Sequence, residues 1–93
     1  MIFNLWIVFF LEKKYAIADL VNTIGSESFV EVSVVAHNWI SDDGSLCLYP
    51  TYLPPKKQAI AIKDCMTPNP QFTSYPATIR YWFGKFFFLI LLL

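Results

Sequence analysis

The sequence is poor in the residues that most often carry enzyme chemistry. It contains one histidine, two cysteines and three glycines that lie far apart. Isolated glycines cannot form a glycine-rich phosphate-binding loop, and His37 has no nucleophile elbow or oxyanion element with which to build a Ser-His-Asp triad. A zinc site would need His37, Cys47, Cys65 and a fourth ligand, without the Cys-x-x-Cys spacing that such sites use. We therefore predict a non-enzymatic protein with no catalytic residue, no metal and no other cofactor.

An excess of charge of one sign is also lacking. Seven Lys and Arg balance seven Asp and Glu, which gives a net charge of zero at pH 7. This balance argues against a general nucleic-acid binder and against electrostatic anchoring at a membrane surface. Two cysteines are too few for a disulfide scaffold. We interpret them as half-buried thiols, with a single bridge in an oxidising compartment as the alternative. An intracellular location is favoured over a secreted or membrane-anchored one.

Two apolar runs are present, at residues 1–11 and 86–93. Both are shorter than the roughly 20 residues of a membrane-spanning helix. No Lys or Arg precedes the first run, as a signal peptide would require. The codons for Phe9–Glu12 can contain a pyrimidine tract followed by AG, an intron acceptor, and those for Gly84–Phe86 can contain GTAAGT, an intron donor. Our hypothesis is that both ends are translated intron, with a signal-like extension as the alternative for the first.

We accordingly divide the chain into an apolar N-terminal extension (1–12), one small β-rich module (13–83) and an apolar C-terminal tail (84–93). The module has about 70 residues, near the lower limit for a domain that folds alone. Its expected stability is only a few kcal/mol. A partner, or the rest of a longer protein, could contribute the remainder.

The longest run with a two-residue period is Phe29–Ile40. Val30, Val32, Val34 and Ala36 alternate with more polar positions, which predicts a strand with one face in a core. We expect this strand to be central, so that the rest of the chain pairs with it or covers its apolar face.

Shorter patterns predict three further strands, at Tyr15–Val21, Leu46–Tyr49 and Ala77–Phe83. Loops rich in turn-forming residues are expected at 22–28, 41–45 and 71–76. Pro54 and Pro55 precede apolar residues spaced by three and four, which predicts a short helix around 56–66. The expected fold is a small α+β domain, in which a bent antiparallel sheet of three or four strands carries one short helix. An SH3- or Tudor-like arrangement is one option.

Aromatic residues are numerous and make up 18% of the chain. We expect most of them to form the core and rim of a small barrel. The alternative is an aromatic groove that reads a peptide or stacks unpaired bases, with basic side chains along it. The residues of this candidate binding groove are Trp39, Tyr49, Tyr52, Lys56, Lys57, Tyr75, Arg80 and Trp82.

Five short motifs follow one another between residues 15 and 80. They are Tyr15–Asp19 (aromatic-Ala-Ile-x-acid), Val34–Trp39 (Val-Val-x-x-x-Trp), Cys47–Pro50 (Cys-x-aromatic-Pro), the lysine-bearing Ile60–Pro68, and Phe72–Ile79 (aromatic-x-x-Tyr-Pro-x-x-Ile). In order and spacing they resemble the N-terminal module of a family of uncharacterised, often transposon-associated insect proteins. The longer members of that family carry a second domain of unknown function. Ala36 stands where the family has proline, and Phe72 where it has tryptophan.

The resemblance implies a small accessory module of unknown activity, and it transfers no catalytic residue. Our first hypothesis is a non-enzymatic protein-interaction module, a fragment of a longer transposon-derived protein, with a protein or peptide partner. The second is a single-stranded nucleic-acid or chromatin-tail binder that uses the aromatic and basic side chains. The third is a small secreted or membrane-anchored protein, for which a membrane is a partner only if the apolar ends are genuine.

Overall fold

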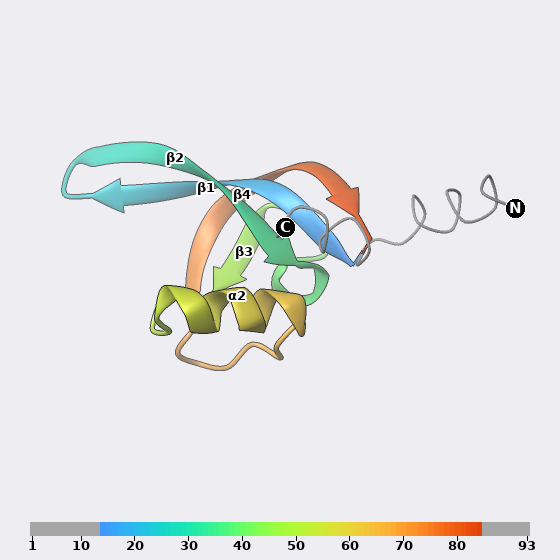
Figure 1. Ribbon diagram of the computed structural model, residues 1–93. Helices are drawn as coiled ribbons and strands as arrows, with labels where there is room; N and C mark the ends of the chain where they lie inside the picture. Colours follow the sequence, from blue (N-terminus) through green and yellow to red (C-terminus); the bar gives the residue numbers. More distant parts are fainter. Residues whose placement is uncertain (1–13, 85–93) are drawn as a thin grey trace, which may run out of the picture.

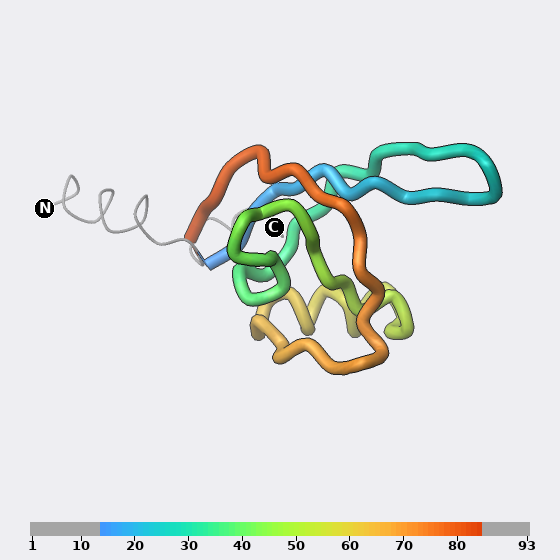
Figure 2. Tube along the Cα trace, turned by 180° about the vertical axis from the view of Figure 1, so that it is seen from behind, coloured from blue at the N-terminus to red at the C-terminus, as the bar shows by residue number. Residues whose placement is uncertain are grey.

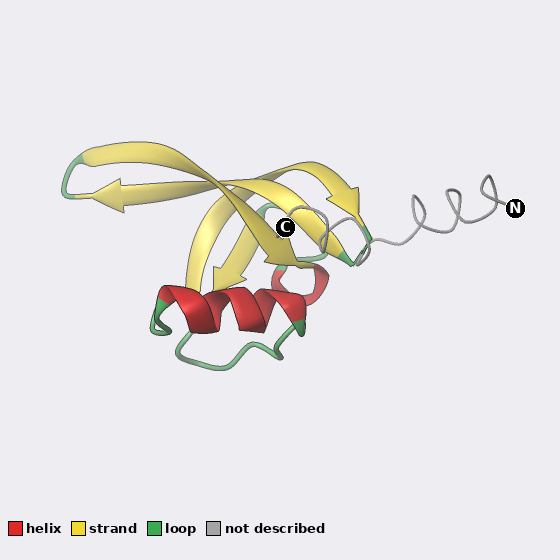
Figure 3. Cartoon of the chain, viewed as in Figure 1, coloured by secondary structure: helices red, strands yellow, loops and turns green. Residues whose placement is uncertain are grey.

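The computed structural model describes residues 14–84. Within this range, four strands form a curled antiparallel sheet, and one α-helix lies below it in Figure 1. The strand order across the sheet is β2-β1-β4-β3, so β2 and β3 form its two edges. The prediction of a small, bent antiparallel sheet with one short helix is confirmed (Figure 3). In chain order the elements are β1 (Tyr15–Ile24), β2 (Glu27–Ala36), the 3-10 turn η1 (His37–Trp39), β3 (Leu46–Tyr49), α2 (Pro55–Lys63) and β4 (Thr73–Phe83).

β1 and β2 form a long hairpin whose tip projects beyond the other strands in both views (Figures 1 and 2). The pairing runs from Tyr15 opposite Ala36 to Ile24 opposite Glu27, which leaves a two-residue loop. Gly25 is the first loop residue and has a φ of 62°, the positive value that a type II′ hairpin turn requires there. The loop expected over 22–28 is wrong, because the ladder continues almost to the glycine.

The strand expected at the centre of the sheet, Phe29–Ile40, corresponds to β2 and lies at an edge. The predicted core face is wrong in the half of β2 near the hairpin loop, although Ala36, which was assigned to the same face, is fully buried. Leu20 is buried and lies opposite Glu31, so the side chain of Glu31 is on the inner face. Val30 and Val32 occupy the outer face, where each is 57% exposed. The alternation predicted the strand, but a period of two does not show which face meets the core.

β4 changes its partner along its length. Its first four residues pair with β3, and the remainder pairs with β1 as far as Phe83 opposite Tyr15. Pro76, which lacks an N–H, stands where the partner changes. A register shift leaves Arg80 without a partner on β1 and forms a β-bulge, which increases the bend. The predicted strand Ala77–Phe83 is confirmed, but it begins earlier, so most of the loop expected before it is strand.

The core is centred on Trp39, which is 1% exposed. Its indole contacts the rings of Tyr49 and Phe72 edge to face, at centroid distances of 5.6 and 5.5 Å. The indole Nε1 donates a hydrogen bond to the carbonyl oxygen of Met66 at 2.7 Å. Nδ2 of Asn38 donates to the same oxygen at 3.3 Å. The 3-10 turn after β2 is therefore tied to the segment that follows α2.

α2 begins at Pro55, because proline is well suited to the first turn of a helix, and it buries Ala61 and Ile62. It ends earlier than the predicted residue 66. The N–H groups of Cys65 and Met66 donate to the carbonyl oxygens of Ile62 and Ala61, and Cys65 has a φ of 48°. This is a Schellman C-cap, in which cysteine occupies the position that glycine usually takes.

The predicted strand at Leu46–Tyr49 is confirmed as β3. The strand predicted at Tyr15–Val21 is also confirmed, as the first part of β1. No helix within residues 14–84 has the length and apolar character needed to cross a membrane. The apolar extension expected at 1–12 and almost all of the tail expected at 84–93 lie outside the described residues.

Candidate functional site

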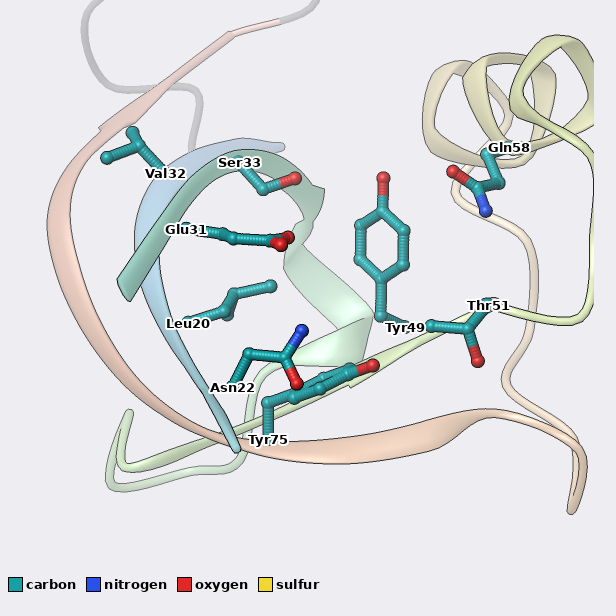
Figure 4. Close-up of a pocket in the computed structure, with 9 residues that line it drawn as sticks. All are labelled: Leu20, Asn22, Glu31, Val32, Ser33, Tyr49, Thr51, Gln58 and Tyr75. Carbon is teal, nitrogen blue, oxygen red and sulfur yellow. The ribbon is translucent and has the colours of Figure 1, made fainter. Parts of the chain in front are cut away.

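A pocket of about 270 Å³ opens between the curled sheet and α2. Its lining comes from all four strands, from α2 and from the turn after β3 (Figure 4). Typical ligand pockets have volumes of about 300–1,000 Å³, so a small chemical group fits this one better than a large cofactor. The lining residues are Leu20, Asn22, Glu31, Val32, Ser33, Tyr49, Thr51, Gln58 and Tyr75.

Side chains from both edge strands face this pocket. Glu31 on β2 and Leu20 on β1 point toward Tyr49 on β3, and Tyr75 on β4 lies below them in Figure 4. Val32 points the other way, as the alternation along β2 requires. The pocket therefore spans the opening between the two edges of the curled sheet.

Three polar lining residues are held in place by hydrogen bonds. Nε2 of Gln58 donates to the carbonyl oxygen of Leu53 at 2.8 Å. The hydroxyl groups of Thr51 and Thr73 share a hydrogen bond at 2.6 Å. The hydroxyl of Ser33 donates to the carbonyl oxygen of the next residue at 3.3 Å. Thr51 and Gln58 are thus held in place on one side of the pocket, and Ser33 on the β2 side (Figure 4).

Four other polar groups of the lining make no hydrogen bond to a described residue. They are the amide of Asn22, the carboxylate of Glu31 and the hydroxyls of Tyr49 and Tyr75. No buried side-chain nitrogen or oxygen in the described part of the chain lacks a partner, so these four groups are within reach of water. These groups are therefore available to hydrogen-bond a ligand that replaces this water.

Among the described residues of the lining, Glu31 is the one that is charged. The single ion pair within residues 14–84 joins Nε of Arg80 to Oδ1 of Asp19 at 2.7 Å. Asp19 lies opposite Val32 and therefore on the outer face of the sheet. The pocket thus combines two tyrosine rings with a carboxylate that has no cationic partner in this part of the protein.

The structure brings together two residues of the predicted groove, Tyr49 and Tyr75, which both line the pocket. Trp39 was predicted to belong to the same surface, and the structure corrects this, because its side chain is buried against Tyr49. Tyr52 packs against Phe72 at a centroid distance of 6.1 Å. Its hydroxyl accepts a hydrogen bond from the Asn69 side chain rather than lining the pocket.

The basic residues of the predicted groove lie elsewhere. Lys56 and Lys57 are exposed in the first turn of α2, outside the pocket lining. Arg80 forms its ion pair on the outer face. Trp82 lies opposite Ala16, near the end of β4 and away from the pocket. The predicted residues are therefore distributed over several surfaces, because they come from the turn after β2, from α2 and from both halves of β4.

The lining also contains residues that sequence reasoning missed, above all Leu20, Asn22, Glu31 and Gln58. Glu31 was placed on the solvent side because its valine neighbours were assigned to the core. The sequence carries no signal for Glu31, because residues 30–34, Val-Glu-Val-Ser-Val, show the ordinary alternation of a half-buried strand.

Two groups outside the pocket lining, the carboxylate of Asp43 and the thiol of Cys47, have shifted pKa values. The backbone N–H and the hydroxyl of Ser45, followed by the hydroxyl of Ser41, donate to Asp43 and lower its pKa to about 2. Burial raises the pKa of the Cys47 thiol to about 12. Cys47 and Cys65 are not joined by a disulfide. In the part of the chain that the structure describes, no group of three or more His, Cys, Asp or Glu side chains is placed to hold a metal ion.

Comparison of the chain with protein-family models, with curated proteins and with solved structures finds no match. The site is therefore defined by its own geometry. It consists of an acidic, aromatic pocket next to the edge strand β2.

Proposed function

We propose that the protein is a non-enzymatic interaction module that binds an extended segment of a partner protein along the open edge of β2. The observation that carries this proposal is that β2, a strand of ten residues, pairs on one side only within the described residues 14–84. An extended segment can add to such an edge as a further strand. Main-chain hydrogen bonds then provide affinity, and pockets beside the edge provide specificity.

At several residues of β2, the backbone N–H and C=O groups point to the open edge of the sheet. Ile24 and Glu27 flank the two-residue loop, and the alternation of the antiparallel ladder then directs the N–H and C=O groups of Val30 and Val32 to the open edge. Outside the hairpin ladder, no backbone hydrogen bond in residues 14–84 involves positions 27–35. The outer side chains of the same valines are apolar and exposed, so an added strand would also cover apolar surface.

Further support comes from the sequence and from the cysteines. The resemblance over residues 15–80 supports an accessory module of a longer, transposon-derived protein. The two thiols support an intracellular location, because oxidising compartments favour disulfides. The strong bend of the antiparallel sheet supports assignment to the SH3- or Tudor-like class.

Binding of single-stranded nucleic acid has less support. Such proteins combine stacking aromatics with a cationic groove along the phosphates, whereas the charged residue of this pocket is Glu31. Arg80 is already paired with Asp19. A secreted or membrane-anchored protein would depend on the apolar ends, which lie outside the described residues.

The test is selection of short random peptides against the full chain, followed by hydrogen exchange of the complex. We expect bound peptides to slow exchange at positions 28–34. The variant Val32→Pro removes an outward N–H that the hairpin does not use, so the fold should be retained and binding lost. Val32→Thr is the matched control, since it keeps the N–H and the branched shape. Selected peptides that protect other residues and still bind the proline variant would refute the proposal.

A further inference from the structure

We infer that the pocket beside β2 binds the cationic side chain of a lysine or arginine in the partner segment. This inference rests on the proposed addition of a strand at the β2 edge. It identifies the chemistry of the segment as basic.

A strand added at the open edge of β2 would place some of its side chains at the pocket. Residues that lie opposite one another on neighbouring strands share a face. Glu31 and Ser33 are on the inner face of β2 and line the pocket. A residue of the added strand opposite either of them would therefore project its side chain to the inner side of the sheet, at the mouth of the pocket.

The chemical groups of the pocket lining favour a cationic side chain of the partner segment. The carboxylate of Glu31 has no ion-pair partner within residues 14–84, and an opposite charge on a neighbouring strand is favourable. The rings of Tyr49 and Tyr75 offer π faces, which attract a cation within about 6 Å. The amide of Asn22 and the two tyrosine hydroxyls add acceptors for an ammonium or guanidinium group.

The size and the other lining residues agree with this assignment. A pocket of about 270 Å³ admits one long side chain. Leu20 supplies an apolar wall for a methylene stem. None of the described residues that line the pocket is Lys or Arg, so none of them repels a cation. An acidic side chain would instead meet Glu31 with like charge.

The experiment uses the full chain and pools of short random peptides that share one fixed central residue, which is Lys, Arg, acetyl-lysine, Gln or Glu. We expect the Lys and Arg pools to bind roughly tenfold more tightly than the acetyl-lysine and Gln pools. Glu31→Gln should abolish this preference, whereas Asp42→Asn, which removes an exposed carboxylate outside the pocket, should leave it unchanged. Tyr75→Phe should keep the preference and Tyr75→Leu should reduce it, because only the second substitution removes the ring.

The outcomes separate this inference from the proposed function. If all pools bind equally and Val32→Pro weakens them all, the module binds strands and the cation site is refuted. If no pool binds, both proposals fail. A preference for Lys that survives Glu31→Gln places the cation elsewhere and also refutes the site. An oligothymidylate strand is included as a competitor, and displacement of the basic pools by it would favour a nucleic-acid surface and overturn the inference.

Discussion

Replacement of Trp39 should be the most destabilising single change in the core. The side chain is 1% exposed. It contacts the rings of Tyr49 and Phe72, and its Nε1 donates to the carbonyl oxygen of Met66 at 2.7 Å. One side chain therefore joins the turn after β2 to β3, to the segment before β4 and to the end of α2.

The expected loss of stability can be estimated from these contacts. Truncation of a buried aromatic residue to alanine costs about 3–5 kcal/mol, and loss of the hydrogen bond to Met66 adds about 1 kcal/mol. A domain of roughly 70 residues has a total stability of only a few kcal/mol. Trp39→Ala should thus remove most of the free energy of unfolding. Trp39→Phe keeps a ring and loses the indole donor, while Asn38 still donates to the Met66 oxygen, so its cost should be about 1–2 kcal/mol.

Urea denaturation of the full chain, followed by far-UV circular dichroism, measures these differences without relying on tryptophan fluorescence. Trp82→Ala is the control, because that side chain is 36% exposed and should lose less. The reasoning would be refuted if Trp39→Ala changed the free energy of unfolding by less than about 1 kcal/mol at an unchanged m-value. It would also fail if the alanine and phenylalanine variants were equally stable.

Three further predictions concern the cysteines, the turn before β3 and the hairpin tip. Iodoacetamide at pH 8 should label Cys65 faster than Cys47 in the folded protein, because Cys47 is fully buried and its pKa is raised to about 12; equal labelling rates would contradict the burial. Asp43 should titrate near pH 2 by NMR, since its hydrogen bonds lower its pKa from 3.8 to about 2. Its contribution to stability should be complete above pH 3.8 and disappear as the pH falls through 2, and Asp43→Asn should remove this part of the acid dependence. Gly25→Ala should destabilise the protein by about 1 kcal/mol, because alanine is strained at a positive φ. A Cβ at Gly25 meets no atom within 4 Å, so a much larger loss would indicate that backbone strain alone does not explain the effect.

Local sequence patterns predicted where the strands and the helix lie, but not which strands pair with one another in the sheet. Leu46–Tyr49 was bounded by a turn and by Pro50, and its predicted limits are those of β3. The helix began where its prolines indicated, but its end depends on an unusual cysteine C-cap that carries no glycine signal. The position of β2 at the edge follows from the pairing of β1 with β4, which are far apart in sequence. No local period contains that information.

For the candidate site, too, the sequence indicated some residues, and the tertiary contacts determined the others. Tyr49 and Tyr75 could be named from composition and lie in one pocket. Glu31 could not, because its face is decided by its position opposite the buried Leu20. Trp39 was named for its chemistry, but its environment makes it a core residue. A residue type therefore suggests a role, and the tertiary contacts decide whether the side chain is available for it.

The pairing of Tyr15 with Phe83 also has a kinetic consequence. The β1–β2 hairpin closes through a two-residue loop, and such hairpins form within about 1–10 μs. Pairing of β1 with β4 must instead close nearly the whole described chain, and non-local contacts of this kind slow folding. The hairpin should therefore form before β4 pairs with it. Until β4 pairs, β1 as well as β2 has an open edge. Association between nascent chains is most favourable in that interval, and the rate of β4 docking determines how long it lasts.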